Sequence, residues 1–271
     1  MLRLSHTPFF FILVSLTQAE KTMKRQTHHG NLVRSIIPIT MLGFITLAAP
    51  PTQAALIHQY RLEGSFADDL GGPNLVPDGG TLGSTSYAFG PNQGLSLSNG
   101  LPDPANYSIE TIFRFADLSG YRKILDFKDL SSDKGLYTLD TALSFYDVAD
   151  GPASAFIPNV DVRLIVTRDD TTDEFVGYVN GVQQFTFTDS SDLAVFTATN
   201  NIIQFFKDDF TTGQSEASAG IVDLIRIYDA PLSATAVAAL GGPPVPVPEP
   251  STLLLLASTV GLLGCVRLRQ K

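Results

Sequence analysis

Between residues 55 and 229, apolar and polar residues alternate along the chain, and this period of two restricts the possible folds more than any other feature of the sequence. In the clearest stretch, Tyr107, Ile109 and Phe113 fall on one face of an extended strand, while Glu110 falls on the other. β-Branched and aromatic residues dominate such stretches, and turn-forming residues separate them. The pattern predicts an all-β domain whose sheets each bury one face.

The sequence also predicts one tight hairpin and the end of the domain. Residues 174–178 and 182–188 are two strand-like runs, and Asn180-Gly181 lies between them. Asn-Gly readily adopts the positive φ angles of a type I′ turn, whose twist matches that of antiparallel strands. The last strand is predicted over residues 221–228, and the serine of the Pro-Leu-Ser that follows can cap a short helix.

Five short motifs follow one another along the chain: YRLEG at 60–64, YSIE at 107–110, YVNGV at 178–182, IVDLIRIY at 221–228 and PLS at 231–233. Their order and spacing resemble those of laminin-G-like domains, which have the concanavalin-A-like jelly-roll fold. Residues 55–240 therefore resemble a laminin-G-like domain, which implies an antiparallel jelly-roll β-sandwich. The tryptophan usual in the second motif is replaced by Phe113 nearby or by Ile112 in register. A fibronectin-type sandwich is the alternative fold.

The charge of the chain is distributed unevenly. Residues 55–250 contain 10 Lys and Arg against 26 Asp and Glu, whereas most of the other basic residues flank apolar runs at the two ends. An acidic domain repels phosphate backbones, so the composition argues against a nucleic-acid partner. The only cysteine, Cys265, lies in the last apolar run, which excludes a disulfide or a thiolate metal site within the domain.

The N-terminal end has the features of an export signal. A basic region that begins at Met23 is followed by an apolar run over residues 36–49 and then by small residues. We predict that signal peptidase cuts between Ala54 and Ala55, so that residues 1–54 form the export region. A second, weaker apolar run precedes Met23, and translation is therefore predicted to start at Met23 rather than at the first methionine.

The C-terminal end combines three elements. Residues 241–250 read GGPPVPVPEP, and they predict an extended linker because proline fixes φ and removes backbone donors. The apolar run over 251–266 predicts a short helix, whose length of about 24 Å is less than the roughly 30 Å of the hydrocarbon core. Basic residues follow as far as residue 271, which predicts a cytoplasmic end. A plain membrane anchor is one interpretation of this tail.

A more specific interpretation comes from the order of these elements. Pro248, Glu249 and Pro250, followed by the apolar run and the basic end, resemble the PEP-CTERM sorting signal of Gram-negative bacteria. The resemblance implies transient insertion of residues 251–271 into the inner membrane, cleavage near the motif by an exosortase, and release to the cell surface or extracellular matrix. Signal peptidase and an exosortase are the processing partners that follow from it.

The domain contains no recognisable catalytic motif. Hydrolases on the resembled fold usually carry E-x-D-x-x-E, which places carboxylates on one face of a strand, and no E-x-D occurs in the domain. His58, the only histidine of the domain, has no accompanying G-x-S-x-G and is interpreted as an exposed strand-edge residue. The pairs Asp169-Asp170 and Asp208-Asp209 are interpreted as solvated turns. No catalytic residue is therefore predicted.

Calcium is the one cofactor that the sequence favours, since it binds hard oxygen ligands and loop carboxylates are plentiful. In jelly rolls of the resembled type, an aspartate at the start of the last strand joins backbone carbonyls of the first strand in a calcium site. Asp223 stands at that position, and Asp68 is a candidate second ligand. Alternatively, Asp223 caps a turn or accepts backbone hydrogen bonds.

The expected function rests on the resemblance and the sorting tail. Together they favour a non-enzymatic binding or adhesive module, with an extracellular polysaccharide as the expected ligand. Tyr121, Tyr137 and Tyr146 are candidates for lining a sugar groove, although packing explains them equally well. The alternative is a divergent polysaccharide hydrolase or lyase, which would show two carboxylates about 5–9 Å apart in an open cleft.

Overall fold

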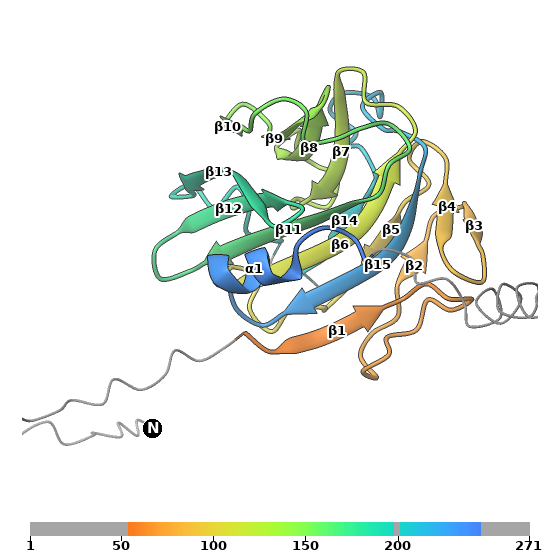
Figure 1. The fold of residues 1–271 in the computed structure, drawn as a ribbon, viewed down its shortest axis with the longest axis horizontal. Coiled ribbons are helices and arrows are strands. Elements are labelled where there is room, and N and C mark those ends of the chain that lie inside the picture. Colours follow the sequence, from red (N-terminus) through yellow and green to blue (C-terminus); the bar gives the residue numbers. More distant parts are fainter. Residues whose placement is uncertain (1–53, 198–200, 245–271) are drawn as a thin grey trace, which may run out of the picture. The chain divides into compact units, whose positions relative to one another are not determined.

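The computed structural model describes residues 54–197 and 201–244, which form two antiparallel β-sheets that enclose one core (Figure 1). Sheet A has eight strands in the order β13-β12-β11-β6-β15-β4-β3, and β1 pairs with the C-terminal part of β15. Its strands are β1 (Leu56–Tyr60), β3 (Thr81–Leu82), β4 (Tyr87–Phe89), β6 (Tyr107–Phe115), β11 (Val162–Asp169), β12 (Glu174–Val179), β13 (Val182–Thr188) and β15 (Gly220–Tyr228).

Sheet B has seven strands in the order β10-β9-β8-β7-β14-β5-β2. Its strands are β2 (Val76–Pro77), β5 (Leu95–Leu97), β7 (Tyr121–Asp126), β8 (Gly135–Leu139), β9 (Ala142–Phe145), β10 (Ala149–Asp150) and β14 (Ile203–Phe205). All strand pairs in both sheets of the described residues are antiparallel. The predicted all-β jelly-roll sandwich is thus confirmed.

The core lies between the two sheets and is built largely of phenylalanine. Phe113 of β6 and Phe89 of β4 both contact Phe206, with ring centroids 5.1 Å and 4.7 Å apart. The predicted alternation along β6 is confirmed, because Tyr107 and Ile109 also belong to this core. Since the domain contains no tryptophan, these smaller rings supply the aromatic burial that holds the sheets together.

The predicted hairpin joins β12 to β13. Asn180 and Gly181 have φ angles of 52° and 81°, and Val179 pairs with Val182 on either side of them. Two consecutive positive φ angles are the requirement of a type I′ turn, so this local prediction is confirmed.

Helix α1 (Ala234–Leu240) crosses the outer face of sheet A (Figure 1). The hydroxyl of Ser233 accepts a hydrogen bond from the backbone N–H of Ala236, which is the predicted N-cap. The helix buries Val237 against the sheet, in a cluster that includes Tyr178. No helix in the described residues is long and apolar enough to cross a membrane. The helix predicted over 251–266 lies outside the described residues.

Candidate functional site

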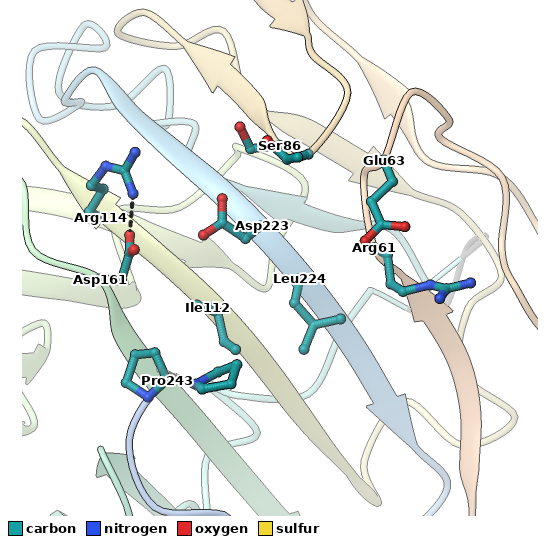
Figure 2. A pocket seen from close by; sticks show the side chains of 11 residues that line it. Arg61, Glu63, Ser86, Ile112, Arg114, Asp161, Asp223, Leu224 and Pro243 are labelled. Atoms are coloured by element: carbon teal, nitrogen blue, oxygen red, sulfur yellow. Dashed lines mark hydrogen bonds and ion pairs between the residues drawn. The ribbon is translucent and has the colours of Figure 1, made fainter. Parts of the chain in front are cut away.

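The outer face of sheet A holds a pocket of about 590 Å³ around Asp223 (Figure 2). A bulge in β15 between Val222 and Leu224 shifts the pairing with β6 at this point, and Asp223 lies within it. We call this cavity the Asp223 pocket. It is lined by Arg61, Glu63, Thr85, Ser86, Ile112, Arg114, Asp161, Asp223, Leu224, Pro243 and Pro244.

Two carboxylates of the pocket, those of Asp223 and the exposed Glu63, have no partner among the described residues, whereas Asp161 pairs with Arg114. Asp223 is half-buried, and no other described residue donates a hydrogen bond to it or forms an ion pair with it. Burial and the neighbouring carboxylate of Asp161 raise the pKa of Asp223 above its ordinary value, against the opposing charge of Arg114. No backbone N–H of the described residues donates to Asp223, so the structure does not contain the backbone hydrogen bonds that the alternative interpretation expects.

Asp68, the second predicted calcium ligand, is not among the residues that line this pocket. Its carboxylate accepts hydrogen bonds from the backbone N–H groups of Gln59, Leu70 and Gly72 at 2.8, 3.1 and 2.8 Å, and it contacts Nδ1 of His58 at 2.7 Å. Burial opposes its ionisation, but these hydrogen bonds outweigh burial and lower the pKa of Asp68. The interpretation of His58 as an exposed residue is wrong, because its side chain is 13% exposed.

Calcium binding at Asp223 stays a prediction. Among the described residues, no group of three or more His, Cys, Asp or Glu side chains is arranged to hold a metal ion, so backbone or water oxygens would have to complete the site. Calcium at 100 times its Kd would add about 2.7 kcal/mol of stability, which corresponds to about 5–10 °C in Tm. We expect Asp223→Asn to abolish this rise in thermal unfolding. A wild-type Tm unaffected by EDTA would contradict the prediction.

The outer face of sheet B carries three tyrosines in mutual contact. Tyr121 lies edge-on to Tyr137 and Tyr146, with ring centroids 5.6 and 5.2 Å apart, and the centroids of Tyr137 and Tyr146 are 6.1 Å apart. Tyr121 and Tyr146 are half-buried, whereas Tyr137 is fully buried between them and Lys123. We call these tyrosines together with Glu216 the tyrosine face. The three residues named from the sequence as a candidate sugar groove are thus neighbours.

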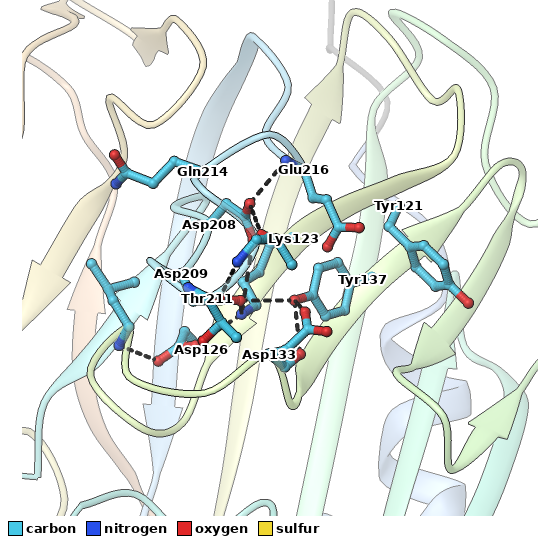
Figure 3. A network of polar contacts seen from close by, with 12 residues as sticks. Tyr121, Lys123, Asp126, Asp133, Tyr137, Asp208, Asp209, Thr211, Gln214 and Glu216 are labelled. Atoms are coloured by element: carbon cyan, nitrogen blue, oxygen red, sulfur yellow. Dashed lines mark hydrogen bonds and ion pairs between the residues drawn. The ribbon is translucent and has the colours of Figure 1, made fainter.

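Glu216 lies on the loop between β14 and β15, beside these tyrosines (Figure 3). Burial, reinforced by the carboxylates of Asp208 and Asp133, raises the pKa of Glu216 to about 7. A carboxyl group with this pKa exchanges its proton near neutral pH and can donate or accept a hydrogen bond there. Sequence reasoning missed Glu216, since nothing in its local sequence indicates the acidic surroundings.

The raised pKa of Glu216 predicts a pH dependence of stability. The folded-state pKa of about 7 exceeds the ordinary value of 4.5, so the contribution of this group to stability is fully present below pH 4.5 and is lost as the pH rises through 7. Because the side chain is half-exposed, solvent screening reduces the expected loss to about 1–2 kcal/mol. Urea unfolding at pH 5 and at pH 8 measures this difference in the free energy of unfolding. Glu216→Gln should remove this difference, and an unchanged difference would contradict the assignment.

Lys123 holds together the carboxylates beneath this face (Figure 3). Its Nζ lies 2.5 Å from Oδ2 of Asp209, 3.0 Å from Oδ2 of Asp126 and 4.0 Å from Oδ1 of Asp208. All four side chains are fully buried. Oδ1 of Asp208 has no hydrogen-bond partner among the described residues. One cation therefore compensates three buried carboxylates.

The interpretation of Asp208-Asp209 as a solvated turn is wrong. Both residues are fully buried, and their carboxylates accept backbone hydrogen bonds from Thr211 and Glu216 at 2.7 and 2.8 Å as well as the ion pair with Lys123. These bonds fold the loop of residues 208–216 back onto sheet B and so place Glu216 beside the tyrosines. The two aspartates are thus structural supports of the tyrosine face.

A protein-family model, the PEP-CTERM protein-sorting motif, matches residues 246–271. The match includes Pro248, Glu249 and Pro250 and confirms the recognition of this motif in the sequence. The chain therefore carries a signal that implies export, processing by an exosortase-type system and transient membrane anchoring through the C-terminal tail. No curated protein matches the chain.

Several solved structures have a similar fold. Trypanosoma rangeli sialidase in complex with a difluoro-nononic acid is 12% identical, with a TM-score of 0.53 over 68% of this chain and 32% of that chain. A mutant of HCR/D is 12% identical, with a TM-score of 0.51 over 68% of this chain and 50% of that chain. Domain 4 of AbnA, a GH43 arabinanase from Geobacillus stearothermophilus, is 19% identical, with a TM-score of 0.48 over 70% of this chain and 99% of that chain.

The present chain spans about a third of the sialidase and half of the HCR/D chain. At these identities, the likeness to the sialidase and to HCR/D shows a shared β-sandwich fold alone.

Proposed function

We propose that this exported protein is a non-enzymatic carbohydrate-binding module of the cell surface or extracellular matrix. The observation that carries the proposal is the tyrosine face on sheet B, where Tyr121 and Tyr146 are half-buried and Glu216 lies beside them. Tyrosine offers an apolar ring for the C–H face of a sugar and a hydroxyl for its polar edge. The face thus combines the two kinds of contact that a saccharide needs.

Polar groups around the tyrosines add the means to orient a sugar. Asp150 lies close enough to Tyr121 for its charge to raise the pKa of that phenol, after the larger effect of burial. Asp133 contacts the hydroxyl of Tyr137 through its carboxylate at 3.1 Å. Carboxylates accept hydrogen bonds from sugar hydroxyls, and those that also accept protein donors are held in a fixed orientation.

Two processing steps would produce the mature protein. Signal peptidase cleavage before Ala55 would convert its backbone N–H, which donates to Oδ1 of Asp229 at 2.7 Å, into an ammonium group paired with that carboxylate. Exosortase cleavage near Pro248–Pro250 would release the domain from the inner membrane. Mass spectrometry of the protein from its native host should find Ala55 at the N-terminus and no residues 251–271. Recovery of the intact C-terminal end would mean that the tail is an ordinary membrane anchor and is not cleaved.

The binding proposal is tested on a glycan array. The full chain, expressed with its own export signal and reconstituted into lipid nanodiscs, should bind at least one extracellular polysaccharide. The double variant Tyr121→Ala with Tyr146→Ala should bind at least about tenfold more weakly, because it removes apolar contact area of both rings. Phe210→Ala is the matched control, since this aromatic residue is 67% exposed and lies outside the tyrosine face. Equal binding by the double variant and the wild type would refute the proposal.

A second candidate function, glycoside hydrolysis, is favoured by one observation. Glu216, with its pKa of about 7, has the acidity required of a general acid, and the carboxylate of Asp133 is close enough to contribute to that pKa. Incubation with each bound polysaccharide, followed by an assay for new reducing ends, separates the two functions. We expect no release. Release that Glu216→Gln abolishes would establish a hydrolase instead.

A further inference from the structure

The Asp223 pocket has an excess of negative charge that the protein leaves unpaired. Three carboxylates and two guanidinium groups line it. Arg114 donates to Asp161 at 2.6 Å, and Arg61 donates to Asp69, outside the lining, at 2.8 Å. Each guanidinium is therefore already held by a carboxylate. Glu63 and Asp223 have no ion-pair partner among the described residues, but Glu63 is exposed, whereas Asp223 is half-buried and faces the cavity (Figure 2).

We propose that the Asp223 pocket binds a primary ammonium group of a small polar molecule, with Asp223 as the anchoring residue. A primary ammonium has three donors in a compact group, which suits a partnerless carboxylate and the neighbouring hydroxyls of Thr85 and Ser86. Ile112 and Leu224 supply apolar walls for the carbon skeleton of the ligand.

The lining also indicates which ammonium compounds fit. None of the described residues that line the pocket is aromatic, and a quaternary ammonium group is recognised chiefly by aromatic faces. The volume of about 590 Å³ accommodates a molecule of the size of a monosaccharide or a phospholipid headgroup. A primary amine is thus favoured over a choline-type group.

The position of the pocket brings two sources of such amines within reach. Pro243 and Pro244 form part of its wall, and the carbonyl of Gly242 accepts a hydrogen bond from Nε of Arg163 at 3.2 Å, which fixes this segment on sheet A. The apolar part of the sorting tail begins seven residues later, at Ser251, which a fully extended chain separates from the pocket wall by at most about 25 Å. An inserted tail therefore keeps the pocket near ethanolamine headgroups, and release exposes it to amino sugars of extracellular polymers.

The proposal is tested by calorimetric titration of the full chain in nanodiscs of phosphatidylglycerol, a lipid without an amine. Phosphoethanolamine and glucosamine are the probes, with phosphocholine and N-acetylglucosamine as matched controls in which the amine is methylated or acetylated. EDTA is present throughout, so that calcium does not compete for Asp223. Binding of phosphoethanolamine alone identifies the headgroup source, binding of glucosamine alone identifies the amino-sugar source, and binding of both shows that the ammonium group suffices.

Variants assign the binding to the pocket. Asp223→Asn keeps the side-chain shape and should weaken binding of the amine at least about tenfold, whereas Asp170→Asn, at an exposed position between β11 and β12 outside the pocket, should leave it unchanged. If Asp223→Asn fails to fold, Asp161→Asn provides the second test and should also weaken binding. The proposal is overturned if neither amine binds, if the acetylated or methylated control binds equally well, or if both pocket variants bind like the wild type. Because the tyrosine face is on the other sheet, sugar binding there is identified by its loss in the double variant Tyr121→Ala with Tyr146→Ala and is scored separately from binding in the Asp223 pocket.

Discussion

Replacing Lys123 by methionine is expected to destabilise the domain by about 3–5 kcal/mol. The substitution keeps the length of the side chain but removes the only cation among the described residues within 4.0 Å of Asp126, Asp208 and Asp209. Three buried carboxylates would then face one another without a compensating charge, and burial already raises the pKa of Asp126. Equilibrium unfolding in urea at pH 7 measures the loss.

A second lysine provides the matched control. Lys134 pairs with Asp147, but the two side chains are 30% and 59% exposed, so their charges are largely screened by solvent. Lys134→Met should therefore cost less than about 1 kcal/mol. Equal costs for the two variants would mean that the network under the tyrosine face is solvated and does not stabilise the fold.

The loop that carries Glu216 should respond to the same substitution. Lys123 binds Asp209 across 86 residues of sequence, and the backbone N–H of Lys123 donates to the carbonyl of Glu216 at 2.8 Å. Loss of the ammonium therefore removes the ion pairs to Asp208 and Asp209 and leaves the backbone hydrogen bond between Lys123 and Glu216.

The fold was predictable because its strongest signals are local. The alternation at Tyr107, Ile109 and Phe113 and the Asn180-Gly181 turn depend only on neighbours in sequence, and the structure contains both. Such patterns determine which face of a strand is buried, and the burial of one face on each sheet largely determines a sandwich.

The Lys123 network was not predictable for the opposite reason. Asp208-Asp209 has the composition of a polar turn, and its burial is decided by a lysine on a distant strand. A bulge between Lys123 and Leu125 also breaks the simple alternation of β7, so the face on which Lys123 lies does not follow from a period of two. Only the assembled sheet brings these charges together.

The candidate sites were predictable in part. The resemblance to laminin-G-like domains singled out Asp223, and the structure places this residue in a pocket. Arg114, Asp161 and Pro243 line the same pocket, but they come from three separate parts of the chain and share no sequence motif with Asp223. The sequence can thus identify one candidate residue in a strand, whereas the residues that surround it and form the site are determined by the tertiary structure.

Glu110→Ala is expected to cost about 3–5 kcal/mol and to release the wall of the Asp223 pocket. The fully buried carboxylate of Glu110 forms an ion pair with Arg163, lies 3.5 Å from Nη1 of Arg226 and accepts a hydrogen bond from the hydroxyl of Tyr228 at 2.9 Å. Without this carboxylate, the guanidinium of Arg163 would be left buried and without an ion-pair partner. The same guanidinium donates the hydrogen bond to the carbonyl of Gly242. Urea unfolding measures the loss, and proteolysis after residue 240 reports the release of the linker.

A double variant separates the charge from the packing. Glu110→Leu combined with Arg163→Met removes both buried charges, so it should recover part of the stability that Glu110→Ala loses, because apolar residues of similar volume often replace a buried ion pair at little cost. The hydrogen bond from Arg163 to Gly242 is absent in this variant, so the linker should remain cleavable even where stability recovers. A linker that stays protected in the stabilised double variant would show that helix α1 alone holds the pocket wall. Recovery of stability together with a cleavable linker would show that Arg163 connects the buried charge of sheet A to the segment leading into the sorting tail.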